Sequence, residues 1–128
     1  VAHLLQKLEE YEGITILATN LKDQIDDAFK RRIRFMVNFR FPSAETRRRL
    51  WHSLLPEAAP RSGDLDLDFF ADQFELSGSQ IKEILLNAAY MAAGMGEPLG
   101  NGQIKEALCI NYEKYGKFLT KEDFGYLG

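Results

Sequence analysis

The sequence lacks several features that would assign it to a class at once. It has one cysteine, Cys109, which excludes an internal disulfide and a cysteine-based zinc site. No apolar run approaches the ~20 residues that a transmembrane helix needs, and no signal peptide opens the chain. The formal net charge is −3, so there is no overall positive field to attract nucleic acid. These absences predict a soluble, cytoplasmic protein whose partners include neither membrane nor nucleic acid.

The chain also lacks the parts that grip nucleotide phosphates. A phosphate-binding loop reads G-x-x-x-x-G-K-[ST], and the one Gly-Lys pair here, Gly116-Lys117, is followed by Phe118. The glycines at positions 94, 96, 100 and 102 have no lysine after them and no strand before them. No apolar strand ends in the Asp-Glu pair that would hold magnesium and activate water. Nucleotide hydrolysis would therefore need groups from outside this sequence.

What is present begins inside a helical pattern. Val1, Leu4, Leu5, Leu8 and Tyr11 share one helix face, and no cap precedes them. We therefore expect the chain to be a piece of something longer.

A mixed pattern then runs to residue 41. Gly13 suits a helix C-terminus, and Ile14–Ala18 is a short apolar run typical of a strand in a covered parallel sheet. A short helix is predicted at Gln24–Lys30, and Phe35–Phe41 alternates apolar and polar residues like an edge strand. Residues 1–41 are thus predicted to be the end of an α/β sheet.

From Pro42 onward the pattern is helical. Ser43 and Asp66 are predicted N-caps, and Ser77 with Gln80 has capping-box spacing before the most amphipathic helix. A flexible connection at 94–102 and a last long helix at 103–115 follow. Residues 42–128 are predicted to be an all-α subdomain, so the whole chain is an α/β fragment followed by helices.

Two polar features could carry chemistry. Asn20 ends the run "ITILATN", at the carboxyl end of a predicted strand, where ligands of parallel sheets bind. Its amide could orient a water molecule and a phosphate oxygen, or it could simply turn the chain. Arg31 and Arg32 suit phosphate, but they could equally be a solvated basic helix end.

Other residues are interpreted as structural. His3 and His52 have no second ligand at metal-binding spacing, and Cys109 lies inside a predicted helix without an adjacent base. Arg47–Arg49 are expected to be a solvated helix turn. The acidic residues Asp64, Asp66 and Asp68 lack the glycine and glutamate of a calcium loop, so capping and solubility explain them better.

Two segments of the chain resemble a known family. The segment "LLQKLEEYEGITILATNLKDQIDDAFKRRIRFMVNFRFPSAETRRRLW" is similar to the second half of an AAA-type ATPase core, a branch of the AAA+ P-loop ATPases. The segment "SGSQIKEILLNAAYMAA" resembles the first helix of that family's lid. The resemblance implies sensor 1 at Asn20, an arginine finger at Arg32 with Arg31 beside it, and adenine-side contacts at Ser77, Gly78 and Ser79. Asp27 would match an acidic residue with a structural role.

The departures from the family narrow what it implies. The family's second arginine would fall on Phe35, so a two-finger mechanism is not expected, and no arginine starts the lid helix. The resemblance implies a parent protein that uses ATP and Mg²⁺, works in a ring of about six protomers and remodels a macromolecule, by default a protein. This segment alone is expected to be inactive. The alternatives are a non-catalytic adaptor with an AAA-like shape and, less favoured, a DNA loader or initiator.

Overall fold

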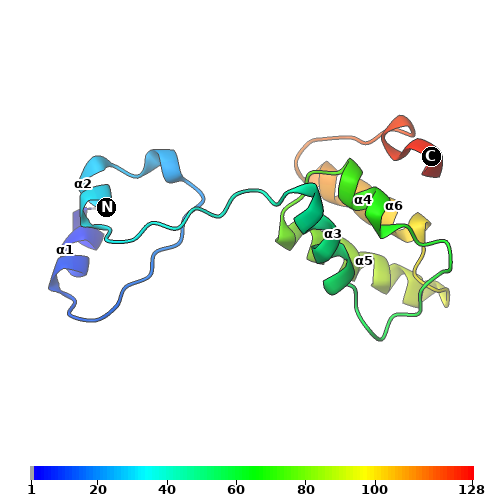
Figure 1. Cartoon of the computed structure of the whole chain (residues 1–128), viewed down its shortest axis with the longest axis horizontal. Helices are drawn as coiled ribbons and strands as arrows, with labels where there is room; N and C mark the ends of the chain where they lie inside the picture. The colour runs from blue at the N-terminus through cyan, green and yellow to red at the C-terminus, as the bar shows by residue number, and fades with distance from the viewer. Residues whose placement is uncertain (1) are drawn as a thin grey trace. The chain divides into compact units, whose positions relative to one another are not determined.

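A computed structural model describes residues 2–128 and divides the chain into two units. The first unit is Val1–Phe39 and the second is Arg40–Gly128 (Figure 1).

Residues 2–39, the described part of the first unit, contain three short helices joined by extended segments. They are α1 (Ala2–Glu10), the 3-10 helix η1 (Lys22–Gln24) and α2 (Asp27–Arg32), so the helix predicted at Gln24–Lys30 is divided in two. α2 begins where Asp26 Oδ1 accepts a hydrogen bond of 2.8 Å from the amide of Phe29. Among the described side chains of this unit, Phe29 alone is buried. The unit therefore gains little hydrophobic stabilisation of its own.

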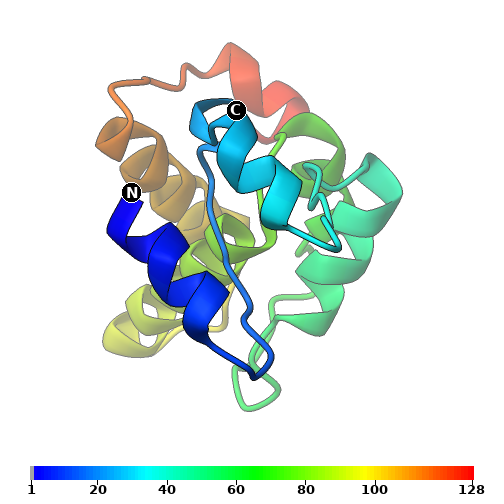
Figure 2. The ribbon, with the colours of Figure 1, turned by 90° about the vertical axis from the view of Figure 1, so that its left-hand side faces the viewer.

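The two predicted strands are not formed, which corrects the α/β half of the expected fold. Residues 2–128 contain no strand, and Figure 2 draws the connection from α1 to α2 without a strand arrow. A strand needs a neighbour for its backbone N–H and C=O groups, and Ile14–Ala18 and Phe35–Phe41 do not pair with each other. Their side chains are correspondingly bare, with exposed fractions of 91% at Ile14 and 92% at Phe39.

Gly13 also has a different role from the predicted helix cap. α1 ends at Glu10, and Gly13 is not among the described glycines with positive φ. A Cβ at Gly13 would lie 2.4 Å from Cε1 of Tyr11. With a larger residue at position 13 the exposed Tyr11 ring would have to move aside.

The second unit is helical, as predicted. It contains α3 (Ala44–Ser53), α4 (Leu67–Gln73), α5 (Gly78–Met95), α6 (Asn101–Lys114) and the 3-10 helix η2 (Glu122–Leu127). α5 packs mainly against α6, and α3 packs mainly against α4. The Trp51 and Phe70 rings stack at 5.7 Å between centroids, which joins α3 to α4. The fully buried large side chains of this core are Trp51, Phe70, Leu76, Ile81, Ile84, Leu85, Leu99, Ile104 and Leu108.

The predicted helix starts are confirmed. Ser43 Oγ, Asp66 Oδ1 and Ser77 Oγ each accept a hydrogen bond from the amide three residues ahead, at 3.3, 3.0 and 3.2 Å. α5 runs further than predicted, to Met95, and its C-cap Gly96 has φ +68°. That left-handed conformation strains residues with a side chain, so glycine suits this helix end.

The C-terminal tail closes the core. Phe124 is buried, and its ring lies 5.6 Å from that of Phe74. Lys105 Nζ donates a hydrogen bond of 2.6 Å to the Leu127 carbonyl. Tyr126 donates its hydroxyl hydrogen to Asp66, and this bond raises the pKa of Tyr126 above its ordinary value. The tail is therefore an integral part of the second unit.

Candidate functional site

The two candidate finger arginines lie in the last turn of α2. Both side chains are exposed, but their surroundings differ. Arg32 donates through Nε to Glu9 on α1 and through Nη1 to the Ala28 carbonyl at 3.0 Å. Within the described part of the chain, Arg31 has no hydrogen-bonding or ion-pair partner. Three cations at positions 30–32 suit the negative end of the helix dipole, so local electrostatics also favours them here.

Asn20 lies at an exposed bend. The amide of Leu21 donates to Thr19 Oγ1 at 3.0 Å, which turns the chain into η1. In residues 2–128 the Asn20 side chain makes no hydrogen bond, so its amide is free to contact another group. Since no sheet forms, the placement of Asn20 at a sheet edge stays a prediction.

Ser77, Gly78 and Ser79 form the start of α5. The hydroxyl of Ser77 caps the helix through Gln80 N and lies 3.1 Å from the Ser79 hydroxyl. Ser77 and Gly78 are half-buried, whereas Ser79 is exposed. A Cβ at Gly78 would meet Leu50 Cδ1 at an ordinary 3.7 Å, so space does not require glycine there. Of the three, Ser79 has the side chain most open to a ligand.

A polar network that the sequence analysis missed fixes the start of α5 against α6. Asn111 is buried and accepts a hydrogen bond of 3.5 Å from Gln80 Nε2, and its own amide donates to Glu83 at 3.3 Å. Glu83 also pairs with Lys114. The signal was available, because Asn111 continues the spacing of Ile104, Ala107 and Leu108 on the buried face.

Arg47 corrects the interpretation of Arg47–Arg49 as a solvated turn. It is buried, and it donates from Nε to the Ala71 carbonyl at 2.7 Å and from Nη1 to the Pro42 carbonyl at 2.9 Å. Arg48 and Arg49 are exposed and pair with Asp72 and Glu45. Arg47 continues the spacing of Leu50, Trp51 and Leu54, which is the pattern that could have identified it.

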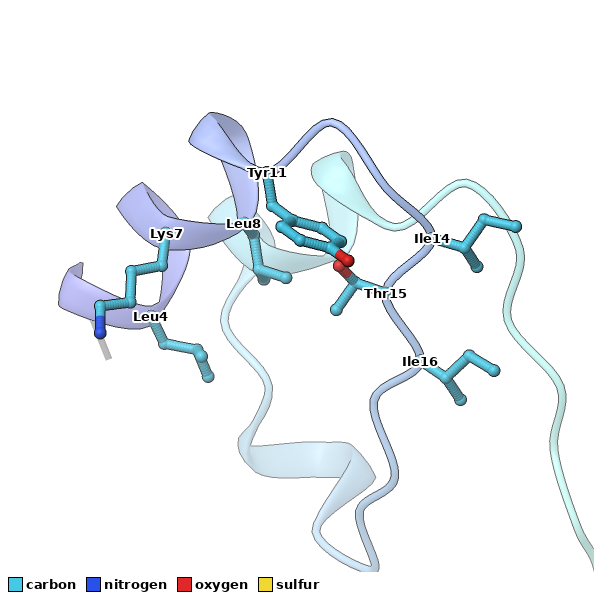
Figure 3. Close-up of a pocket in the computed structure, with 7 residues that line it drawn as sticks. All are labelled: Leu4, Lys7, Leu8, Tyr11, Ile14, Thr15 and Ile16. Atoms are coloured by element: carbon cyan, nitrogen blue, oxygen red, sulfur yellow. The ribbon is translucent and has the colours of Figure 1, made fainter.

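Two hollows among the described residues contain no predicted site residue. The first, of about 400 Å³, lies between α1 and residues 14–16 and is lined by Leu4, Lys7, Leu8, Tyr11, Ile14, Thr15 and Ile16. Figure 3 shows the Tyr11 ring directed toward Thr15, while Ile14 and Ile16 point away from α1. The mostly apolar lining suits packing more than phosphate. The second hollow includes Asp64 and Glu97, whose negative charges oppose an anion.

The structural interpretation of the remaining candidates agrees with their surroundings. Burial raises the pKa of Cys109, which disfavours its thiolate and hence a nucleophilic role. His52 Nε2 lies 2.9 Å from Asp68 on the surface. His3 is exposed.

The described residues meet part of what ATP and magnesium would require. Arg31 and Arg32 offer guanidinium groups for phosphate, and Asn20 offers an exposed amide. Residues 2–128 contain no group of three or more His, Cys, Asp or Glu side chains that could hold a metal ion. The described residues therefore do not by themselves make a preformed metal site. Asn20, Arg31 and Arg32 belong to the first unit and Ser77–Ser79 to the second.

Comparison with known proteins gives one family. Its model, described as the contractile injection system ATPase helical domain, matches residues 43–109, more than half of the chain. The match includes α3, α4, α5 and the first part of α6, with Ser77–Ser79 inside it. No curated protein matches the chain. In the described residues, no helix is both long and apolar enough to cross a membrane. With its capped helices and buried core in the matched region, the chain belongs to the family of contractile injection system ATPase helical domains.

Proposed function

We propose that this chain supplies the sensor-1, arginine-finger and lid elements of an AAA-type ATPase. The longer protein would bind and hydrolyse ATP in a ring of about six protomers and remodel a macromolecule, by default a protein. The observation that carries the proposal is the match of residues 43–109 to an ATPase helical domain. In the sequence, the matched segment comes directly after the first unit, which carries two exposed arginines, Arg31 and Arg32, at the end of α2.

In this proposal each site residue has its own role. Arg32, with Arg31 beside it, reaches the ATP of the neighbouring protomer and stabilises the charge that develops during phosphoryl transfer. Asn20 acts on the nucleotide of its own protomer, where its amide positions the attacking water. Ser77, Gly78 and Ser79 contact the adenine side weakly. ATP and Mg²⁺ are bound mainly by groups that this sequence does not contain.

The bare apolar segments of the first unit support this assignment. Ile14, Ile16, Phe35, Val37 and Phe39 are each at least 74% exposed in segments with no strand partner. Large apolar side chains exposed to this extent are typical of an interface. In the proposed protein these segments join a parallel sheet and are covered there.

The first test replaces Arg32 in the longer ATPase. Arg32→Ala should lower kcat for ATP hydrolysis about 10³-fold, because fingers of this kind contribute at least that much, while nucleotide binding persists. Lys30→Ala removes the same charge from the same helix turn and is the matched control. Steady-state hydrolysis and equilibrium binding of a fluorescent ATP analogue give the two quantities.

Two outcomes would decide against the proposal. Unchanged hydrolysis in Arg32→Ala would remove the finger role, and an ATPase that is inactive even without substitution would favour the non-catalytic adaptor. A mixture of Arg32→Ala protomers with protomers that cannot bind ATP tests action in trans. Mixed rings should regain partial hydrolysis, because an intact finger then faces an intact nucleotide site.

A further inference from the structure

Arg32 is held by its own chain. Its Nε pairs with Glu9 of α1, and its Nη1 donates to the Ala28 carbonyl one turn back on α2 at 3.0 Å. Arg31, its neighbour in sequence, has neither kind of contact among the described residues. The guanidinium group of Arg32 is therefore bound within its own chain, whereas that of Arg31 is open to other groups.

The ion pair between Arg32 and Glu9 is exposed to solvent and is easily broken. The side chains of Arg32 and Glu9 are 43% and 54% exposed, so water and salt reach both charges. Ion pairs at such positions are weak and are screened by salt. A phosphate group that carries two or more negative charges presents several acceptors to the guanidinium and competes effectively with one carboxylate.

The Glu9–Arg32 pair also connects two helices. Glu9 lies in the last turn of α1 and Arg32 in the last turn of α2, so it joins the two α-helices of the first unit. Apart from Phe29, the described side chains of this unit are not buried, so few other contacts hold the helices in place. Withdrawal of Arg32 would therefore remove one of the few contacts between α1 and α2.

We propose that Glu9 is a latch for the arginine finger: it holds Arg32 within its own protomer until a polyphosphate on a neighbouring protomer competes for the guanidinium. The inference rests on the proposed function, since it adds regulation to the same arginine. Arg32 then has two alternative acceptors, Glu9 in its own chain and phosphate in the next. Polyphosphate binding at Arg32 Nε and the Glu9–Arg32 pair exclude each other.

The latch can be tested on this chain without hydrolysis. The Arg32 Nε–Hε signal is followed by ¹⁵N NMR, assigned by its loss in Arg32→Lys, during titration with inorganic tripolyphosphate. Glu9→Gln should shift this signal before any titration, because Nε loses its ionic acceptor. It should also tighten tripolyphosphate binding at Arg32 about two- to fivefold at low salt, as expected for loss of an exposed pair. The gain should shrink as salt is added.

Glu10→Gln is the matched control, because it removes the same charge from the next residue of α1. The side chain of Glu10 accepts a hydrogen bond from Gln6 and does not contact Arg32. Equal tightening in the two variants would reduce the effect to net charge and overturn the latch. An unmoved Arg32 signal in Glu9→Gln would overturn it as well.

Different experiments test the latch and the proposed function, so the failure of one can be told from the failure of the other. If Arg32→Ala leaves ATP hydrolysis of the longer protein unchanged, the finger role is wrong, whatever the NMR titration gives. If Arg32→Ala abolishes hydrolysis but Glu9→Gln behaves like Glu10→Gln in the titration, the finger stands and the latch is wrong.

Discussion

Arg47 shows how one buried cation can organise a helical unit without an acidic partner. Its guanidinium bonds the Ala71 carbonyl near the end of α4 and the Pro42 carbonyl just before α3. The carbonyl end of a helix carries partial negative charge, which favours a cation there. The Arg47 side chain thus links the first residues of the second unit to the end of α4.

Arg47→Met should destabilise the second unit by about 1–3 kcal/mol, because it keeps the apolar stem but leaves two carbonyls without their donors. Urea unfolding followed by Trp51 fluorescence measures this, since Trp51 is the one tryptophan and lies in the core beside Phe70. Arg49→Met is the control, because Arg49 is exposed and pairs with Glu45 inside the same helix. A similar midpoint for the two variants would contradict this role for Arg47.

At the scale of elements, an exposed ion pair joins α3 to α4. Arg48 donates to both carboxylate oxygens of Asp72, at 2.8 and 2.5 Å, which is the two-point geometry that suits a guanidinium. The hydrogen bonds from Arg48 lower the pKa of Asp72 below its ordinary 3.8. The folded state therefore prefers the ionised carboxylate more than the unfolded chain does.

The sign of the pH effect follows from this lowered pKa. The contribution of Asp72 to stability is present above about pH 4 and is lost as pH falls through the lower pKa of the folded state. Unfolding midpoints of the wild type and Asp72→Asn should therefore differ most at neutral pH and converge progressively as the pH falls below about 4. The same comparison in an Arg48→Met background supplies the control. A difference that does not change with pH, or that survives in this background, would contradict the assignment.

At the scale of the whole molecule, the two units differ in how they are stabilised. The second unit has a continuous core of buried aromatic and aliphatic side chains, including Trp51, Phe70 and Phe124. The first unit buries Phe29 alone among its described side chains and leaves its extended segments without ladder hydrogen bonds. Local opening is easiest where few apolar contacts and few backbone hydrogen bonds resist it.

Limited proteolysis should therefore separate the units. Thermolysin, which cuts beside large apolar residues, should cleave this chain first within residues 14–17 and 35–41. It should leave a resistant fragment from about Ala44 to Gly128. In the proposed longer ATPase the same sites should be protected, because the proposed sheet covers them. Mass spectrometry of the early products identifies the cuts, and equally fast cleavage inside α5 or α6 would contradict the difference between the units.

Local signals predicted the second unit well, since short-range interactions determine where a helix starts. Ser43, Asp66 and Ser77 cap helices because each oxygen reaches an amide three residues ahead, whatever the rest of the chain does. The strands at 14–18 and 35–41 could not be settled in this way. Apolar alternation states a preference, but a strand exists only when a second backbone pairs with it.

The candidate site shows the same difference between local and long-range interactions. The sequence by itself determined which residues are proposed to meet phosphate, namely Asn20, Arg31 and Arg32, and where α5 begins, after its cap Ser77. Only the tertiary structure decided that Glu9 pairs with Arg32. It also decided that the buried Arg47 donates hydrogen bonds to the carbonyls of Pro42 and Ala71, and that Asn111 links α6 to α5. Glu9–Arg32, Arg47–Ala71 and Asn111–Gln80 each join groups more than 20 residues apart in the chain. Such contacts depend on packing in three dimensions, whereas caps and helical periods depend on neighbours within one turn.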